Sequence, residues 1–203
     1  MSSFSLAQSS YLLPLPKELP SLDYLLEGFW REHGDPRSAD YPFMSSVRVP
    51  GTLLTAYLLF VLWIGPRWMA RRERAFSLKP LLLVYNLALA AYNGYVFARL
   101  LLNPGHLVER VLDTRYPPVE DRSEWTLAVI DDIYIYIISK YVDLLDTVFF
   151  VLRKKQSQVT ALHLYHHFMV AANGWVIFRL CALCNVCSLF VLLNSGIHLL
   201  MYR

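Results

Sequence analysis

Residues 49–66 read VPGTLLTAYLLFVLWIGP, a run of eighteen residues that carries no formal charge and lies between Arg48 and Arg67. An α-helix rises about 1.5 Å per residue, so roughly 20 residues cross a hydrocarbon core about 30 Å thick. The run is close to the length that one crossing needs. It therefore predicts a membrane-spanning helix.

Charge-free runs of similar length recur along the rest of the chain. They comprise residues 80–98, 156–178 and 180–202, which hold nineteen, twenty-three and twenty-three residues when histidine is counted as neutral. Continuous runs of this length rarely recur within one short soluble domain. Four of them in 203 residues indicate an integral membrane protein.

A fifth segment, residues 125–152, is also apolar but contains formal charges. These are Asp131, Asp132, Lys140, Asp143 and Asp146. Charged side chains inside a spanning helix are costly, so we expect them to face the protein interior or a water-filled cavity. With this segment included, we predict an all-α fold: a polytopic membrane helix bundle with about five spanning helices.

The composition excludes several other classes of protein. Hydrophobic residues make up 56% of the chain and charged residues 17%, whereas soluble domains average about 25% charged. So apolar a chain is not disordered, and three closely spaced cysteines are too few for a disulfide scaffold. The net charge of +3 is too small to indicate nucleic acid as a partner. We expect an N-terminal segment, residues 1–48, and a membrane-embedded domain, residues 49–203.

Basic residues concentrate in two of the expected loops. Residues 67–79 hold five arginines and lysines against one glutamate, and residues 153–155 read Arg-Lys-Lys. The positive-inside rule places both loops in the cytosol. Two spans separate the loops, so the two assignments agree with each other. The segment 1–48 is then expected to be lumenal.

Four histidines lie on the predicted membrane helices or at their ends. His163, His166 and His167 stand at i, i+3 and i+4, so they share one helical face. His198 follows Asn194 by four residues, so these two side chains also point the same way, one turn apart. The triplet is difficult to explain by packing alone, whereas Asn194 and His198 are equally consistent with hydrogen bonding between helices.

A second polar group lies on the preceding segment. Lys140, Asp143 and either Asp146 or Thr147 fall along one helical face. A buried ion pair between Lys140 and Asp143 would explain part of this pattern, but three charges within eight residues are costly for packing alone. The basic run that follows is either a topology signal or a site for the phosphates of an anionic substrate. It consists of Arg153, Lys154 and Lys155.

Two chemistries fit histidines beside carboxylates in a membrane. Imidazoles bind iron or zinc at such spacings, as in membrane di-iron oxygenases and desaturases. Those enzymes carry several histidine boxes, whereas this chain has one box and His198, so no metal ligand is assigned. The other chemistry is covalent acyl transfer, in which a neutral imidazole attacks a thioester and a second group moves the proton. This chemistry needs no bound cofactor.

Several motifs, in order, resemble the fatty acid elongases of the endoplasmic reticulum, which are 3-ketoacyl-CoA synthases. The resemblance extends from about Pro50 to Tyr202. Its motifs are residues 65–69 (GPRWM) with 76–79 (FSLK) and Tyr85-Asn86, residues 140–155 (KxxDxxDTVFFVLRKK), His163-x-x-His166-His167, and Asn194-x-x-x-His198-x-x-Met201-Tyr202.

The resemblance implies an acyltransferase of long and very long chain fatty acid elongation. Such an enzyme joins a fatty acyl-CoA to malonyl-CoA, forms a histidine-acyl intermediate, and releases a 3-oxoacyl-CoA, carbon dioxide and CoA. The resemblance assigns catalysis to His166 as the nucleophile, with His198, His163, His167, Asn194, Asp143 and Asp146. It assigns substrate binding to Lys140, Thr147, Arg153, Lys154, Lys155 and Tyr202.

The resemblance also bears on location and completeness. It implies a multi-pass protein of the endoplasmic reticulum membrane whose catalytic face is toward the cytosol. Family members have about seven spans, so we expect a chain that ends at Arg203 to be incomplete at its C-terminus. A non-catalytic membrane subunit therefore stays open as an alternative. Expected partners are acyl-CoA, malonyl-CoA and the lipid bilayer, together with other enzymes of the elongation cycle or a second copy of the chain.

Overall fold

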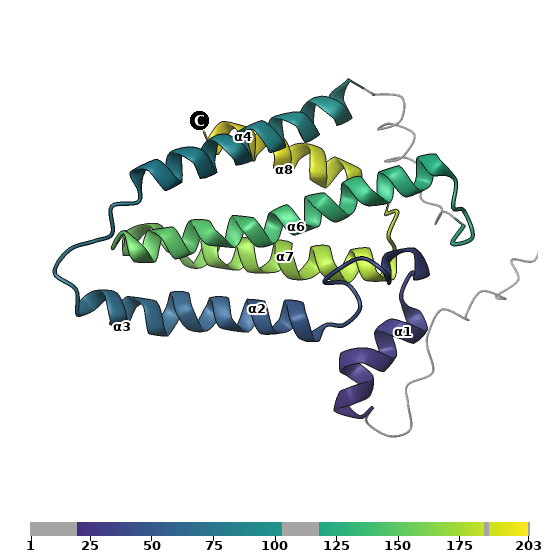
Figure 1. The fold of residues 1–203 in the computed structure, drawn as a ribbon, viewed down its shortest axis with the longest axis horizontal. Helices are drawn as coiled ribbons and strands as arrows, with labels where there is room; N and C mark the ends of the chain where they lie inside the picture. The colour runs from purple at the N-terminus through teal and green to yellow at the C-terminus, as the bar shows by residue number, and fades with distance from the viewer. Residues whose placement is uncertain (1–19, 103–117, 185–186, 203) are drawn as a thin grey trace, which may run out of the picture.

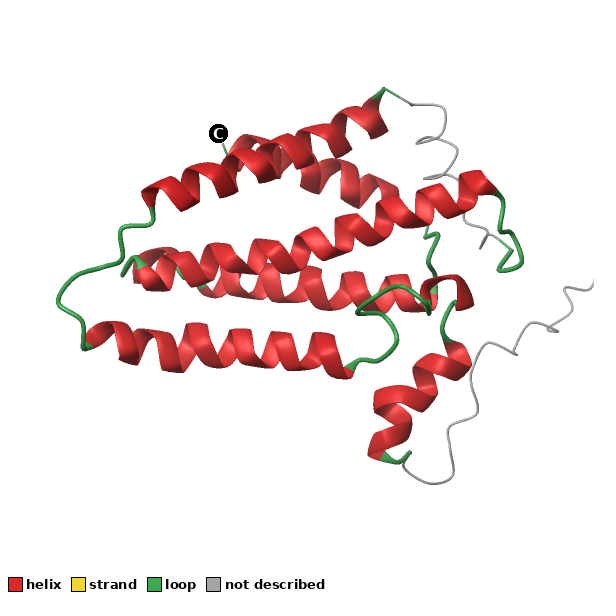
Figure 2. Ribbon diagram, viewed as in Figure 1, coloured by secondary structure: helices red, strands yellow, loops and turns green. Residues whose placement is uncertain are grey.

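The computed structural model describes residues 20–102, 118–184 and 187–202. Within these ranges the chain consists of helices joined by loops and turns, with no strand (Figure 2). The long helices are α2 (Arg48–Leu59), continued by the π-helical segment η3 (Phe60–Ile64) and by α3 (Gly65–Ala70), then α4 (Lys79–Leu101), α6 (Glu124–Leu152), α7 (Ala161–Leu180) and α8 (Cys187–Met201). They fall on the five predicted segments, so the all-α prediction is confirmed.

Hydropathy supports two membrane spans directly. Among the described residues, Arg48–Ala70 and Lys79–Leu101 are long and apolar enough to cross a membrane, with 23 residues each. The helix α8 is apolar but has only 15 residues. The charges of α6 and the histidines of α7 lower the hydropathy of these two helices. The prediction of five spans therefore stays a prediction.

Side-chain caps define where the polar helices begin. The Oγ of Ser123 accepts a hydrogen bond from the backbone N–H of Thr126 at 3.3 Å, at the start of α6. The Oγ1 of Thr160 accepts one from the backbone N–H of His163 at 3.1 Å, at the start of α7. Such caps satisfy amide groups that have no partner within the helix. The second cap places His163 in the first turn of α7.

The long helices form two pairs and one continuous helical unit. The helix α4 packs along α8, α6 packs along α7, and the continuous unit from α2 to α3 contacts α7 and α6 (Figure 1). The α6–α7 pair is therefore central, with α4 and α8 on one side and α2 and α3 on the other. A site built on α6 and α7 therefore lies between the α4–α8 pair and the continuous unit from α2 to α3.

The two basic loops meet at one end of the bundle (Figure 1). The backbone N–H of Phe76, in the loop between α3 and α4, donates to the carbonyl oxygen of Leu152 at 3.1 Å. The Nζ of Lys154 donates to the carbonyl oxygen of Arg72. Both loops therefore lie at the same end of the bundle, as the two spans between them predict.

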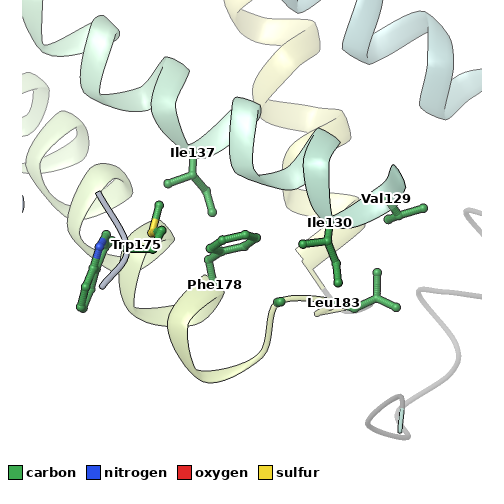
Figure 3. Packing of buried hydrophobic residues seen from close by; sticks show 8 residues of the cluster. Val129, Ile130, Ile137, Trp175, Phe178 and Leu183 are labelled. Carbon is green, nitrogen blue, oxygen red and sulfur yellow. The ribbon is translucent and has the colours of Figure 1, made fainter. Parts of the chain in front are cut away.

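The segment that precedes α2 packs onto the opposite end of the bundle. Figure 3 shows Phe178 of α7 between Ile137 and Ile130 of α6. The indole of Trp175 donates from Nε1 to the carbonyl oxygen of Phe43 at 3.0 Å. The buried side chains of this cluster are Met44, Val129, Ile130, Ile137, Trp175, Phe178, Ala182 and Leu183. Part of the expected N-terminal segment is thus joined to the bundle, while its residues 1–19 lie outside the described residues.

A buried polar network fixes the end of α7. Asp35 and Arg37 form an ion pair at 2.8 Å, with side chains 3% and 1% exposed. The Nη1 of Arg179 donates to the carbonyl oxygen of Asp35 at 2.9 Å and to the Oγ of Ser38 at 2.7 Å. The backbone N–H of Ala182 donates to Asp35 Oδ2 at 3.0 Å. Asp35 therefore connects the segment before α2 to the turn that follows α7.

The charge of Asp35 predicts how stability changes with pH. Burial alone would raise the pKa of this carboxyl, but the hydrogen bonds and the charge of Arg37 together lower the pKa below its ordinary value. A lowered folded-state pKa means that the carboxylate stabilises the fold above about pH 4, and that this stabilisation is lost as the pH falls through the folded-state pKa. Asp35→Asn is therefore expected to lower Tm near neutral pH, and the difference from wild type should shrink below about pH 4. Thermal unfolding in detergent at a series of pH values measures Tm for wild type and for Asp35→Asn. A difference in Tm that stays constant below about pH 4 would contradict the lowered pKa of Asp35.

Gly65 marks a close approach between α3 and α6. A Cβ at this position would lie 2.8 Å from Val151 Cγ1 and 2.8 Å from the carbonyl oxygen of Phe60. We expect Gly65→Ala to lower the free energy of unfolding by about 1–3 kcal/mol, because such overpacking displaces neighbouring atoms. The matched control is Gly51→Ala in the same helical unit, where a Cβ would meet nothing within 4 Å. It should be neutral or stabilising by up to about 1 kcal/mol, and equal losses in both variants would contradict the packing argument.

Candidate active site

A cavity of about 910 Å³ separates the α4–α8 pair from the α6–α7 pair. Its lining is mostly apolar and includes Val96, Leu100, Met169, Val170, Ile177 and Val191. The lining includes the ion pair between Arg99 and Asp132, whose Nη2 and Oδ2 atoms are 2.7 Å apart. Lys140 and His166 line the cavity as well. The volume is in the range of binding sites for small molecules, and the apolar lining suits a hydrocarbon chain.

A small polar recess adjoins this cavity. The recess is lined by Lys140, Asp143, His166, His167, Val170 and His198. Lys140, His166 and Val170 line the cavity as well. The two spaces therefore meet at one ammonium group and one imidazole. A molecule with an apolar tail and a polar reacting group could place each part in the matching space.

Lys140 and Asp143 form a buried ion pair beside His198. The Nζ of Lys140 lies 2.7 Å from Asp143 Oδ2, and both side chains are 2% exposed. The Nδ1 of His198 lies 3.5 Å from the same oxygen. Among the described residues, neither Asp143 Oδ1 nor His198 Nδ1 has a hydrogen-bond partner. Buried polar atoms are nearly always paired in proteins, so these two atoms are available to a bound polar group.

Asn194 of α8 is held by two donors from α6. The hydroxyl of Tyr136 donates to Asn194 Oδ1 at 2.8 Å, and Lys140 Nζ donates to the same oxygen at 3.2 Å. The ammonium group also lies 4.8 Å from the centre of the Tyr136 ring. Asn194 therefore does form an interhelical hydrogen bond, and this bond also orients Lys140. The sequence motifs do not include Tyr136, although its place four residues before Lys140 puts it on the same helical face.

The three histidines of α7 differ in their surroundings. His167 is buried, with its ring centre 4.3 Å from that of His163 and 6.3 Å from that of His198. His163 is partly buried and its Nε2 lies 3.0 Å from Thr147 Oγ1. His166 is exposed, and its exposed surface faces the cavity and the recess. Of the three, His166 is therefore the one that a bound molecule can reach most directly.

A known protein family matches most of this chain. The family described as "ELO: GNS1/SUR4 family" matches residues 42–203, most of the chain. The chain belongs to the ELO family. The resemblance in the sequence motifs is thereby confirmed.

Individual relatives of this ELO chain carry consistent names. It is 36% identical over 172 residues to "Very long chain fatty acid elongase 1" of Homo sapiens, which covers 84% of this chain and 60% of that protein. It is 35% identical over 168 residues to "Very long chain fatty acid elongase 4" of Mus musculus, with 83% and 52% covered. For "Very long chain fatty acid elongase F" of Drosophila melanogaster, the identity is 32% over 169 residues, with 79% and 62% covered. The ELO chain thus spans between half and two thirds of the length of these relatives.

Other predicted site residues of the ELO chain lie outside the cavity and the recess. The hydroxyl of Tyr202 donates to Asp146 Oδ2, which ties the end of α8 to α6. The hydroxyl of Thr147 contacts His163 but reaches neither space. The basic run Arg153, Lys154 and Lys155 follows the last turn of α6 at the end where the basic loops meet, and in the described part of the chain none of the three lines either space.

The metal-site alternative has a geometric test. Across residues 20–102, 118–184 and 187–202, no group of three or more histidine, cysteine, aspartate or glutamate side chains is arranged to hold a metal ion. The imidazoles of His163, His166 and His167 contact one another through their rings.

Proposed function

We propose that this chain carries out the condensation step of fatty acid elongation, in which a fatty acyl-CoA and malonyl-CoA give a 3-oxoacyl-CoA, carbon dioxide and CoA. The observation that carries the proposal is the position of His166, at the junction of an apolar cavity and a polar recess. The relatives named as very long chain fatty acid elongases are consistent with a cavity of this kind. The chain spans 60% and 52% of the length of these two relatives, so their names support the condensation activity of this chain without establishing it.

The first step would transfer the acyl group to His166. A neutral imidazole nitrogen of His166 attacks the thioester carbonyl, a nitrogen–carbon bond forms and the carbon–sulfur bond breaks. The CoA leaves as a thiol that takes the proton lost from the imidazole. The acyl chain would lie in the cavity, while the developing negative charge on the carbonyl oxygen lies near the ammonium group of Lys140.

The second step would use malonyl-CoA. Loss of carbon dioxide from malonyl-CoA leaves an enolate, whose carbon attacks the acyl carbonyl on His166. A carbon–carbon bond forms, the nitrogen–carbon bond breaks with its electron pair going to the imidazole nitrogen, and that nitrogen takes up a proton from water, which restores neutral His166. Lys140 and His198 are placed to stabilise the enolate and the oxyanion, because charge stabilisation is strong in a buried site.

The proposed location is the endoplasmic reticulum membrane, with the N-terminus in the lumen and the catalytic face toward the cytosol. Two helices apolar enough to span a membrane support membrane insertion. The contact between the two basic loops supports a common side for residues 67–79 and 153–155. A cytosolic position of that side follows from the positive-inside rule.

The first step can be tested without malonyl-CoA. Purified protein in detergent is mixed with an acyl-CoA labelled in its acyl group. We expect release of about one CoA per chain and a labelled peptide that contains His166, because an enzyme with a covalent intermediate completes the first half of its reaction alone. Addition of malonyl-CoA should then move the label into a 3-oxoacyl-CoA. If neither CoA release nor a labelled product occurs, the chain is instead the non-catalytic subunit that the sequence left open.

A further inference from the structure

A chain of buried hydroxyl groups leads from α2 to the histidines of α7. The hydroxyl of Tyr57 donates to Thr147 Oγ1 at 2.8 Å, and Thr147 Oγ1 lies 3.0 Å from His163 Nε2. Tyr57 is 6% exposed and Thr147 is fully buried. These residues come from α2, α6 and α7, so three helices meet at this point. The sequence motifs do not include Tyr57.

The hydrogen-bond requirements of this chain favour one tautomer of His163. A hydroxyl group has one proton, and within the described residues the buried hydroxyl of Tyr57 is paired with Thr147 Oγ1, so donation from Tyr57 to Thr147 leaves no buried donor unpaired. The proton of Thr147 is then directed at His163 Nε2, which must offer a lone pair. A neutral imidazole carries its proton on the other nitrogen, so His163 is protonated at Nδ1. Burial keeps water from competing with these bonds and makes them stronger than in solution.

The fixed ring of His163 in turn positions the catalytic histidines. The ring centre of His163 lies 4.3 Å from that of His167, and the ring centres of His167 and His166 are 5.6 Å apart. The ring centre of Phe150 lies 5.4 Å from that of His163. A rotation of His163 would therefore displace His167 and, through it, His166. The occupied Nε2 also leaves His163 poorly suited to act as a nucleophile.

We propose that Tyr57 is a positioning residue, which acts through Thr147 to hold His163 as the Nδ1-protonated tautomer beside His166. The contribution of this tautomer to the rate rests on the proposed condensation reaction. The tautomer itself does not rest on that reaction. Two measurements therefore separate the two ideas.

The first measurement is the ¹⁵N NMR spectrum of histidine-labelled protein in detergent at neutral pH. The His163 signals are assigned by their loss in His163→Gln. We expect wild type and Thr147→Ser to show the Nδ1-protonated form of His163, because serine retains the hydroxyl. Tyr57→Phe and Thr147→Val should show a mixture of tautomers. The control is Tyr141→Phe, which removes a buried hydroxyl that has no hydrogen-bond partner among the described residues, and it should match wild type.

The second measurement is steady-state kinetics of condensation in the same variants. Tyr57→Phe and Thr147→Val should lower kcat by up to roughly 10²-fold, the effect of a misplacement of about 1 Å, with little change in KM. Thr147→Ser should lower kcat less than Thr147→Val does, because serine retains the hydroxyl, and Tyr141→Phe should retain kcat.

The possible results distinguish the tautomer of His163, the positioning role of Tyr57 and the proposed function. An Nε2-protonated His163 in wild type, or an unchanged tautomer in both Tyr57→Phe and Thr147→Val, would overturn the inference. A changed tautomer with unchanged kcat would overturn the positioning role. If wild type does not condense at all, the proposed function fails while the NMR result still decides the tautomer.

Discussion

Replacing His166 by alanine is expected to abolish the incorporation of labelled malonyl-CoA into longer acyl chains. His166 is the exposed member of the histidine triplet, and it lines both the apolar cavity and the polar recess. Without its imidazole the acyl group has no acceptor at the junction of the two spaces. Loss of a nucleophile reduces rates by roughly 10³-fold or more, which places the variant below detection in a microsomal assay. Chromatography of the acyl products measures the effect.

A second histidine provides the matched control for this experiment. His33 lies at the end of α1 (Phe29–His33), where its ring stacks on Phe29 at 4.7 Å, and it lines neither the cavity nor the recess. His33→Ala should therefore retain activity within about twofold, as expected of a change away from the reacting atoms. Retained activity in His166→Ala together with lost activity in His198→Ala would show that the nucleophile lies on α8 and not on α7. That result would refute the proposed mechanism.

The helices of the bundle could be predicted because the signal is local. A charge-free run such as 49–66 is sufficient to indicate a helix of membrane length, whatever surrounds it. The prediction that the charges of α6 face inward holds for Lys140 and Asp143, which are buried. It does not hold for Asp131, which is exposed and accepts a hydrogen bond from the hydroxyl of Tyr41.

The pairing of the helices could not be predicted in the same way. The α4–α8 contact joins segments that are far apart in sequence, and both present apolar residues on most faces. One determinant is Gly196, where a Cβ would lie 2.9 Å from the ring of Phe97. The absence of a side chain at that position lets the two helices approach. Such a contact depends on two residues about one hundred positions apart, so neither sequence segment reveals it alone.

The candidate site was predictable where its residues share one helix. The i, i+3, i+4 spacing of the histidines and the i, i+3 spacing of Lys140 and Asp143 each specify a face, and the structure brings the two faces together at one recess. Tyr57 and Tyr136 were missed because a tyrosine in an apolar run gives no sign of which hydroxyl finds a partner. The same reason applies to Asp35 and its network, which depends on Arg179 from the end of another helix.

The second large effect expected is the loss of stability on replacing Lys140 by methionine. This change retains most of the length of the side chain but leaves the carboxylate of Asp143 buried without its cation, since both side chains of the pair are 2% exposed. Removing one partner of a buried ion pair costs about 3–5 kcal/mol. Thermal unfolding in detergent should therefore show a markedly lower Tm. The control is Arg48→Met, which removes exposed pairs with Asp23 and Glu27, where about 0–1 kcal/mol is expected for each.

The double variant Lys140→Met/Asp143→Leu separates packing from chemistry. Removing both charges leaves no uncompensated ion, so most of the lost stability should return, as for other buried pairs that are replaced by apolar residues. Condensation should stay lost, because the ammonium group beside His166 and the carboxylate beside His198 are both absent. A double variant as unstable as Lys140→Met would show that the effect is not electrostatic. A double variant that regains stability without activity would show that the ion pair is retained for the reaction, which decides between the two explanations that the sequence allowed for these charges.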